Sequence, residues 1–260
     1  MLDFNKLYIT LLFLLICLHR QGIAQTQITV MADKGYPPYS FISKGKLTGI
    51  YTDILKEVFS NLKDYQIKMK PIDWKKGLGQ MRGGEGFALY PPYKRKDRPF
   101  MSYTVPILDE ELSIFCNSRV FDKTRDQWPK SFYGLRISRN TGFSTGKSYE
   151  DAVKAGYIID IQKRTNYQNL VLLIFNHTDC YVNDGAAIAY ELNKLQRRGK
   201  YEGKGIDRGI TISSEAGYLG ISKNHQKFKF IDHFTNQYNQ QMNLFKQSEK
   251  FKKILEKYGI

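Results

Sequence analysis

Segments typical of β-strands alternate along this chain with segments typical of α-helices, and this alternation restricts the fold more than any other feature. Residues 28–32 suit a strand, and residues 52–62 carry one apolar stripe at helical spacing, with Thr52 as the expected cap. Residues 66–71 alternate apolar with basic side chains, as a half-buried strand does, and residues 87–89 form a short apolar run after a glycine-rich turn. This alternation favours an α/β fold, in which helices pack against sheets.

A second series of strands and helices begins near residue 111. Its expected strands are residues 112–117, 135–138, 158–161 and 180–182, and its expected helices are residues 146–155 and 166–175, the latter capped by Asn166. The polar residues 119–130 are typical of a loop, and two amphipathic helices at residues 231–245 and 248–258 end the chain. The 236 residues that follow residue 24 are long enough for two compact lobes or one large domain.

The first 24 residues have the pattern of a secretory signal peptide. Lys6 supplies the positive charge, and residues 7–18 form an apolar run that is too short to span a bilayer comfortably. Small residues ending at Ala24 offer a cleavage site. We therefore expect export, with the mature chain beginning near Gln25.

The chain is strongly basic. Its formal net charge is +15, and loss of Asp3, Lys6 and Arg20 with the signal peptide lowers it to +14. An exported protein rarely meets nucleic acid, and the basic residues are dispersed rather than clustered. Dispersion favours a solvated basic surface, whereas attraction to an acidic ligand or to anionic envelope components is the alternative.

Two cysteines remain in the mature chain, Cys116 and Cys180. An oxidising compartment permits a disulfide between them. Each lies inside an apolar, strand-like segment, however, and we expect two buried free thiols.

Three polar groups follow predicted strands at positions that suit a small ligand. Arg98 ends a basic loop, and a guanidinium binds a carboxylate through two parallel hydrogen bonds. Residues 142–146 open a helix with N–H and hydroxyl donors, as an anion site does. Asp184 ends a buried strand, where α/β proteins bind ligands. Each group also has a structural interpretation: a surface arginine, a plain helix cap, and an Asp that caps a helix near Ala186.

Aromatic side chains are concentrated near these polar groups. Tyr36, Tyr93 and Phe143 would give a small ligand contact area at low entropic cost. Filling of the core is the alternative for such rings, and we expect Trp74 to pack beneath the surface of its lobe.

The segment 142–146 also matches G-x-S-x-G, the nucleophile elbow of serine hydrolases, with Ser144 as the nucleophile. Asp184 and then His225 or His233 follow in the order that hydrolases use. Three polar residues separate the motif from the predicted strand, and too little chain follows to complete such a fold, so the hydrolase is disfavoured. The histidines lack metal-ligand spacing, and we expect neither a metal nor a cofactor.

Taken in order, these segments resemble the bacterial extracellular solute-binding proteins of family 3, which are periplasmic receptors for polar amino acids in ATP-driven uptake systems. Each motif is weak alone, but their joint order is specific and covers nearly the whole mature chain. The segments are residues 35–41, 45–49 with Asp53, 72–74, 96–98, 134–137, 142–144, 179–184, 221–225 and 254–259.

The resemblance implies roles for individual residues. Arg98 would bind the α-carboxylate of a ligand with help from Ser144, Asp184 would bind its α-ammonium group, and Tyr36 would stack on its body. The chain departs from the family where residues 90–93 read Tyr-Pro-Pro-Tyr in place of small hydroxyl residues. Because proline has no N–H to donate, the ligand is expected to be bulkier than a common amino acid or to be held differently.

The resemblance further implies a type II periplasmic-binding fold of two α/β lobes joined by a two-strand hinge. We expect residues 25–110 and 218–260 in the first lobe and residues 111–217 in the second. The expected function is non-catalytic capture of an amino acid or related small polar solute by a periplasmic monomer, for uptake through an inner-membrane ABC permease or for sensing. The enzymatic alternative on the same fold is a dehydratase or lyase that uses Asp184 or Glu215 as acid or base.

Overall fold

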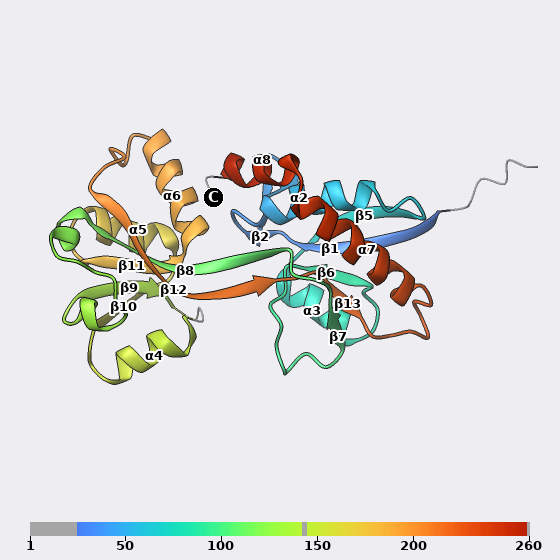
Figure 1. Ribbon diagram of the computed structural model, residues 1–260, viewed down its shortest axis with the longest axis horizontal. Helices are drawn as coiled ribbons and strands as arrows, with labels where there is room; N and C mark the ends of the chain where they lie inside the picture. The colour runs from blue at the N-terminus through green and yellow to red at the C-terminus, as the bar shows by residue number, and fades with distance from the viewer. Residues whose placement is uncertain (1–24, 142–144, 259–260) are drawn as a thin grey trace, which may run out of the picture.

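The computed structural model describes residues 25–141 and 145–258. Two five-stranded sheets lie at opposite ends of an elongated molecule, and helices cover both (Figure 1). Helices and strands alternate as the sequence predicts, and the predicted pair of α/β lobes is present.

The first sheet has the order β5-β1-β6-β13-β7, with the first three strands parallel and the last two antiparallel to their neighbours. Its strands are β1 (Thr26–Asp33), β5 (Tyr65–Ile72), β6 (Ala88–Tyr90), β7 (Met101–Tyr103) and β13 (Gly220–Ser222). Helices α2 (Ile50–Ser60), α7 (Ile231–Lys246) and α8 (Glu249–Tyr258) contribute to its main core, and α3 (Trp74–Arg82) packs on a smaller cluster. A three-stranded sheet of β2 (Gly35–Tyr36), β3 (Ser40–Ser43) and β4 (Lys46–Thr48) lies beside it.

The second sheet has the order β10-β9-β11-β8-β12. Its strands are β8 (Leu108–Asn117), β9 (Arg136–Asn140), β10 (Ile159–Lys163), β11 (Cys180–Asp184) and β12 (Ile206–Gly217). Helix α4 (Gly146–Lys154) packs in one apolar cluster, whereas α5 (Asn166–Ile174) and α6 (Gly185–Arg197) share another. The helices therefore cover both faces of this sheet, as the α/β prediction requires.

Two long antiparallel strands, β8 and β12, lead from the second sheet toward the first (Figure 1). They pair from Asn117 opposite Ile206 to Leu108 opposite Gly217, with register shifts near Thr211. The sequence pattern indicated the second half of β8, but it did not indicate β12. The exposed positions of β12 carry polar side chains over most of its length, so it lacks the apolar run of a buried strand.

Three predicted boundaries are wrong. Helix α2 begins at Ile50 with Gly49 before it, and Thr52 is buried beside the Tyr90 hydroxyl instead of capping the helix. Helix α5 is capped by Thr165, whose hydroxyl accepts from the Gln168 N–H, and not by Asn166. The polar residues Arg139 and Asn140 continue strand β9 because they bond within the lobe.

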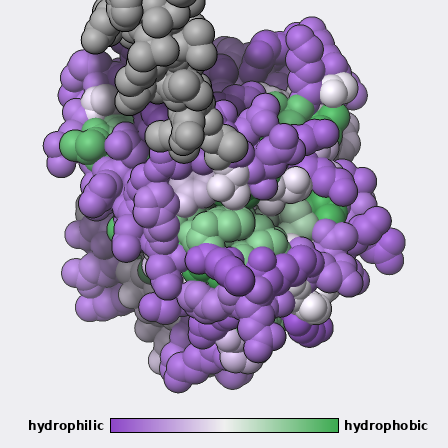
Figure 2. All heavy atoms as spheres, turned by 90° about the vertical axis from the view of Figure 1, so that its right-hand side faces the viewer, coloured by the Kyte–Doolittle hydropathy of each residue, from purple (hydrophilic) through white to green (hydrophobic). Residues whose placement is uncertain are grey.

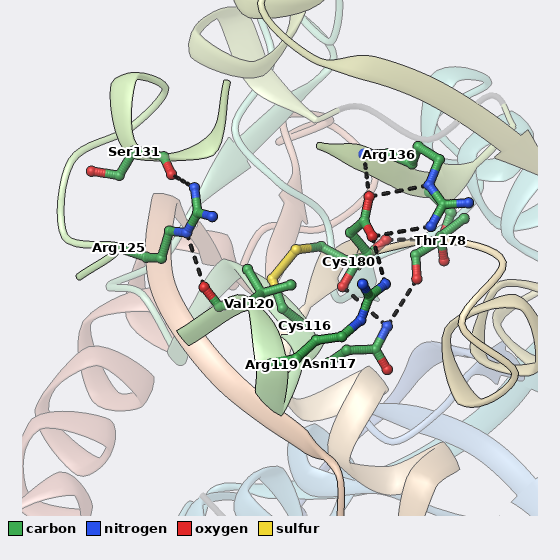
Figure 3. Close-up of a disulfide and its surroundings, with 11 residues drawn as sticks. Cys116, Asn117, Arg119, Val120, Arg125, Ser131, Arg136, Thr178 and Cys180 are labelled. Atoms are coloured by element: carbon green, nitrogen blue, oxygen red, sulfur yellow. Dashed lines mark hydrogen bonds and ion pairs between the residues drawn. A yellow bond between two sulfur atoms is a disulfide. The ribbon is translucent and has the colours of Figure 1, made fainter. Parts of the chain in front are cut away.

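The expectation of two free thiols is also wrong, because Cys116 and Cys180 form a disulfide (Figure 3). Strands β8 and β11 are antiparallel neighbours, and their register places Cys116 directly opposite Cys180. Both residues are fully buried, as the apolar segments suggested. The 64-residue separation hid this pairing, since sequence alone did not show that the two strands are adjacent.

Among the residues that the structure describes, no helix is both long and apolar enough to cross a membrane. Figure 2 views the end of the molecule formed by the first lobe, and most of that face is hydrophilic around a smaller hydrophobic group.

Candidate functional site

A cleft of about 1020 Å³ is lined by residues of both sheets and their connecting loops. Its first-lobe side carries Tyr36, Trp74, Tyr93 and Arg98, and its second-lobe side carries Asp184 among several polar residues. Four of the six side chains predicted as ligand contacts, Tyr36, Tyr93, Arg98 and Asp184, therefore lie around one cavity. The other two, Phe143 and Ser144, lie outside the described residues, while the adjoining Thr145 and Gly146 line the cleft.

The loop that carries Tyr36 is held tightly against the start of α2. Gly49 has a φ of +122°, and a Cβ there would lie 2.3 Å from the carbonyl oxygen of Tyr39, so glycine is required. The Ile50 and Tyr51 amides donate to the carbonyls of Pro38 and Tyr39 at 3.0 Å. These contacts fix the turn through Tyr36 at the edge of the cleft.

Arg98 lies in the loop between β6 and β7, where its guanidinium stacks over the Trp74 ring at 5.6 Å. One N–H donates to the carbonyl oxygen of Tyr93 at 3.1 Å. The described structure gives Arg98 no carboxylate partner, and its remaining donors are thus available to an acceptor in the cleft. Trp74 lines the cleft as well as packing on the lobe, so the expectation of packing alone was incomplete.

Asp184 both caps a helix and lines the cleft, the two roles that its sequence position allowed. Its Oδ1 caps helix α6 by accepting the Ala187 N–H at 2.8 Å, and its Oδ2 accepts the Tyr39 hydroxyl at 2.7 Å. The side chain also lines the cleft. Burial raises the pKa of Asp184 to about 6, although the hydrogen bonds from Tyr39 and the helix oppose this rise.

A second buried carboxylate, Glu110, was missed by the sequence analysis. It is 4% exposed, lines the cleft and accepts hydrogen bonds from three tyrosines. Tyr51 donates to Oε1 at 2.6 Å, Tyr93 donates to Oε2 at 2.5 Å, and Tyr36 donates to the same Oε2. Burial, and then the nearby charge of Asp184, raise the pKa of Glu110 to about 7. The only sequence signal was an acidic residue at the start of a strand, which is a common arrangement.

The stacked pair Tyr36 and Tyr39 connects the two carboxylates. Their ring centroids are 5.0 Å apart, with an angle of 29° between the rings. One hydroxyl of the pair bonds Glu110 and the other bonds Asp184. Tyr39 is 1% exposed, so it is a core residue that still reaches the site with its hydroxyl.

An amide cluster forms part of the second-lobe wall and was also missed. Asn140 donates to the Asn166 oxygen at 2.6 Å, and Asn183 donates to the Tyr181 hydroxyl at 2.8 Å. Asn140, Asn166 and Asn183 all line the cleft. Their positions at strand and helix ends are the signal that could have indicated them.

The described residues around the cleft do not assemble a hydrolase triad, and the candidate nucleophile Ser144 lies outside them. The described lining contains no histidine, and His233 bonds the Tyr65 hydroxyl at 2.6 Å in the first lobe. Glu215, the other acid considered for an enzyme, pairs with Arg95 through both carboxylate oxygens. Within residues 25–141 and 145–258 no group of three or more metal-ligating side chains is found.

Comparison with protein families bears out the resemblance seen in the sequence. Residues 28–86 match the model of the bacterial extracellular solute-binding proteins, family 3. This segment includes Tyr36, helix α2 and Trp74. A comparison with curated protein sequences finds no match.

Solved structures of similar architecture cover most of the chain. Substrate-binding domain 2 of GlnP from Lactococcus lactis, in an open conformation, is 15% identical with a TM-score of 0.71, over 90% of this chain and 96% of that one. The L-cystine solute receptor of Neisseria gonorrhoeae, unliganded and open, is 16% identical with a TM-score of 0.69, over 90% and 93%. A polar amino acid ABC uptake transporter substrate-binding protein from Streptococcus thermophilus is 16% identical with a TM-score of 0.68, over 91% and 90%. These likenesses confirm the predicted type II periplasmic-binding fold.

Proposed function

Because residues 28–86 match family 3 of the bacterial extracellular solute-binding proteins, we propose that this chain is a solute-binding receptor. It captures an amino acid or a related small polar solute in the cleft between its lobes. The neighbouring structures named as receptors or substrate-binding domains of transporters support the same class of function.

The observation that carries this proposal is the placement of opposite charges on opposite sides of one cleft. Arg98 reaches it from the first lobe and Asp184 from the second. A carboxylate on Arg98 and an ammonium group on Asp184 would connect the lobes, so binding would favour the closed arrangement. Tyr36 and Tyr93 would cover the body of the ligand.

The proposed closure depends on how the chain is divided into two lobes. We retain residues 25–110 with 218–260 as the first lobe and residues 111–217 as the second. On this division β8 and β12 form the two-strand hinge, and the cleft opens and closes as the lobes rotate about it.

The residues near Arg98 indicate how this receptor differs from its relatives. Pro91 lines the cleft and has no N–H to donate, so fewer backbone donors reach the ligand than small hydroxyl residues would provide. The amide cluster of the second lobe adds neutral polar groups to the wall. We infer a ligand with a polar body larger than that of a small amino acid.

We further infer that the protein works outside the cytoplasm as a monomer and delivers its ligand to an inner-membrane ABC permease. The disulfide between Cys116 and Cys180 supports export, because such bonds persist in oxidising compartments. The match to an extracellular family agrees with this location.

A thermal-shift screen tests the proposal. The panel contains the standard L-amino acids, L-cystine, short peptides and small organic acids, each with the purified mature chain. A ligand that binds only the folded cleft should stabilise it by about 2.7 kcal/mol at roughly 100 times its dissociation constant. Melting temperatures that stay flat across all classes would remove the support for a receptor.

The same samples separate binding from catalysis. Mass spectrometry after prolonged incubation should recover each bound compound unchanged, because a receptor releases what it captures. Conversion of a panel compound by the wild type, lost in Asp184→Asn, would instead establish an enzyme.

A further inference from the structure

Glu110 is a buried carboxylate at the cleft, and within the described structure no basic side chain pairs with it. It lies near the start of β8, and its hydrogen-bond partners are the hydroxyls of three tyrosines. A buried charge without a counter-charge is costly, so the protonation of such a group is sensitive to its surroundings.

Three oxygen atoms, one each from Tyr36, Tyr93 and Glu110, form a triangle of hydrogen-bonding contacts. The two phenol oxygens are 2.8 Å apart, and both hydroxyls bond the same carboxylate oxygen, Oε2. Each phenol carries a single hydrogen, so when Glu110 is ionised only two hydrogens are available for the three oxygen–oxygen contacts. A proton on Glu110 supplies a third hydrogen, and each of the three contacts can then be a hydrogen bond.

The other carboxylate oxygen anchors the cluster to the body of the protein. Tyr51 of α2 donates to Oε1 at 2.6 Å, and Gly217 of β12 lies against both groups. A Cβ at Gly217 would come within 1.9 Å of the Tyr51 hydroxyl oxygen and 3.1 Å of Oε1. Glu110 is therefore fixed from behind, while Tyr36 and Tyr93 face the cleft.

We propose that Glu110 is a positioning residue for the ligand site. Its proton determines the hydrogen bonds between Tyr36 and Tyr93, and so the placement of these two rings along the cleft. Its effect on binding rests on the proposed receptor function. Its effect on the two tyrosines does not, and can be measured without a ligand.

The charged groups that face Glu110 come from several elements. Asp184 lies at the start of α6, and its charge disfavours ionisation of Glu110. Glu215 is opposite Glu110 on β12, but its charge is paired with Arg95. Because the pKa of Glu110 is raised to about 7 by burial and then by Asp184, the proton exchanges near neutral pH.

A ligand ammonium group at Asp184 would change this balance. It cancels the charge that disfavours ionisation and attracts the ionised form, so binding releases part of a proton from Glu110. The affinity for an amino acid should therefore weaken as the pH falls through about 7.

Ultraviolet difference spectra of the ligand-free mature protein test the positioning role between about pH 5.5 and 8.5, well below the usual tyrosine pKa. The wild type should show a change in tyrosine absorption with a midpoint near pH 7, because the pKa of Glu110 is raised to about 7. Glu110→Gln should lack it. Tyr51→Phe should keep it with a higher midpoint, because a bond that favours the ionised carboxylate is gone.

Tyr149→Phe is the matched control, because it removes a buried phenol in the second lobe that bonds Asp160 and not Glu110. It should leave the transition unchanged. The proposal is overturned if the wild type shows no transition, if the transition persists in Glu110→Gln, or if Tyr51→Phe leaves the midpoint in place.

Calorimetry with each L-amino acid that shifts the melting temperature tests the effect on binding. Wild-type affinity should be about three to four times weaker at pH 6.5 than at pH 8, and Glu110→Gln should bind about equally at both. Equal wild-type affinities, or the same pH dependence in Glu110→Gln, would remove the coupling to the ligand. If no compound of the panel binds at any pH, the receptor function fails, and the tyrosine spectra still decide the positioning role.

Discussion

Arg98 and Asp184 differ in how many of their hydrogen-bonding positions other residues of the protein already use. Among the described residues, Arg98 gives one hydrogen bond to a carbonyl and stacks on Trp74, which leaves several donors for a ligand. Both oxygens of Asp184 already accept a hydrogen bond, one of them from Tyr39. A ligand ammonium must therefore share Oδ2 with the Tyr39 hydroxyl, whereas a ligand carboxylate meets a fork that is largely unused.

Truncation of either charged group should weaken binding. Arg98→Ala and Asp184→Asn should each cost about 2 to 5 kcal/mol of binding free energy, because the opposite charge on the ligand is left unpaired in a poorly hydrated cleft. Arg98→Lys should recover only part of the loss, since an ammonium group cannot form the two parallel bonds. The measurement is calorimetric affinity for an amino acid found in the screen.

Arg82→Ala is the matched control for this series, because Arg82 stacks on Phe100 in the first lobe and does not line the cleft. It should bind as the wild type does. Wild-type affinity in Arg98→Ala would contradict the charge clamp, and a loss in Arg98→Ala without one in Asp184→Asn would indicate a carboxylate ligand that lacks the amine.

The buried carboxylates also give the fold an unusual pH dependence. The pKa of Glu110 is raised from 4.5 to about 7 and that of Asp184 from 3.8 to about 6, both first by burial. Between pH 4 and 7, roughly, the folded chain keeps protons that the unfolded chain has lost. The contribution of these two groups is therefore most favourable below this window, and it declines as the pH rises through it.

Urea unfolding of the ligand-free protein across this window measures the effect. For Glu110 the decline should approach about 3 kcal/mol, and Glu110→Gln should remove its share. Comparing the wild type with this variant cancels the titration of groups that do not interact with Glu110, and the difference contains the titration of Glu110 together with its coupling to Asp184. A difference in unfolding free energy that stays constant from acid to neutral pH would contradict the raised pKa.

The disulfide acts at the scale of elements, because it joins β8 to β11 at the centre of the second sheet. One of these strands leads into the hinge, and the other ends at Asp184. The bond therefore ties the strand that positions a predicted ligand contact to a strand of the proposed hinge.

Loss of this bond should destabilise the second lobe. Replacing both cysteines by serine should lower the free energy of unfolding by about 2 to 4 kcal/mol, chiefly because the unfolded chain gains freedom. Dithiothreitol should lower the stability of the wild type and leave the double variant unchanged. Equal stability of the oxidised and reduced wild type would mean that the disulfide does not form in solution.

Local pattern predicted the elements well, but it did not predict which elements are neighbours. The positions of most helices and strands followed from apolar spacing, strand-end chemistry singled out Arg98 and Asp184, and the family resemblance assigned each a role. Glu110, the disulfide and the role of β12 depend on contacts between segments that are far apart in the chain. No local spacing encodes such contacts, so these features became visible only in the folded structure.

At the scale of the whole molecule, the proposed receptor function requires export, because the receptor would meet its ligand outside the cytoplasm. We predict that N-terminal sequencing of the protein recovered from the cell envelope begins near Gln25. A chain that retains Met1 and remains in the cytoplasm would contradict export. The variant Ala24→Leu removes the small residue of the cleavage site. It should therefore yield less of the processed, mature form than the wild type.

The two hinge strands have a mechanical consequence. Paired antiparallel strands lie about 4.8 Å apart and form a ribbon that is one strand thick. Flexing the ribbon across its thin direction only adjusts backbone torsions, whereas shearing it in its own plane would stretch one strand, compress the other and break the ladder between β8 and β12. The connection is therefore easy to bend in one direction and resistant to sideways shear, so lobes that close about it would bring the two cleft walls together in the same alignment each time.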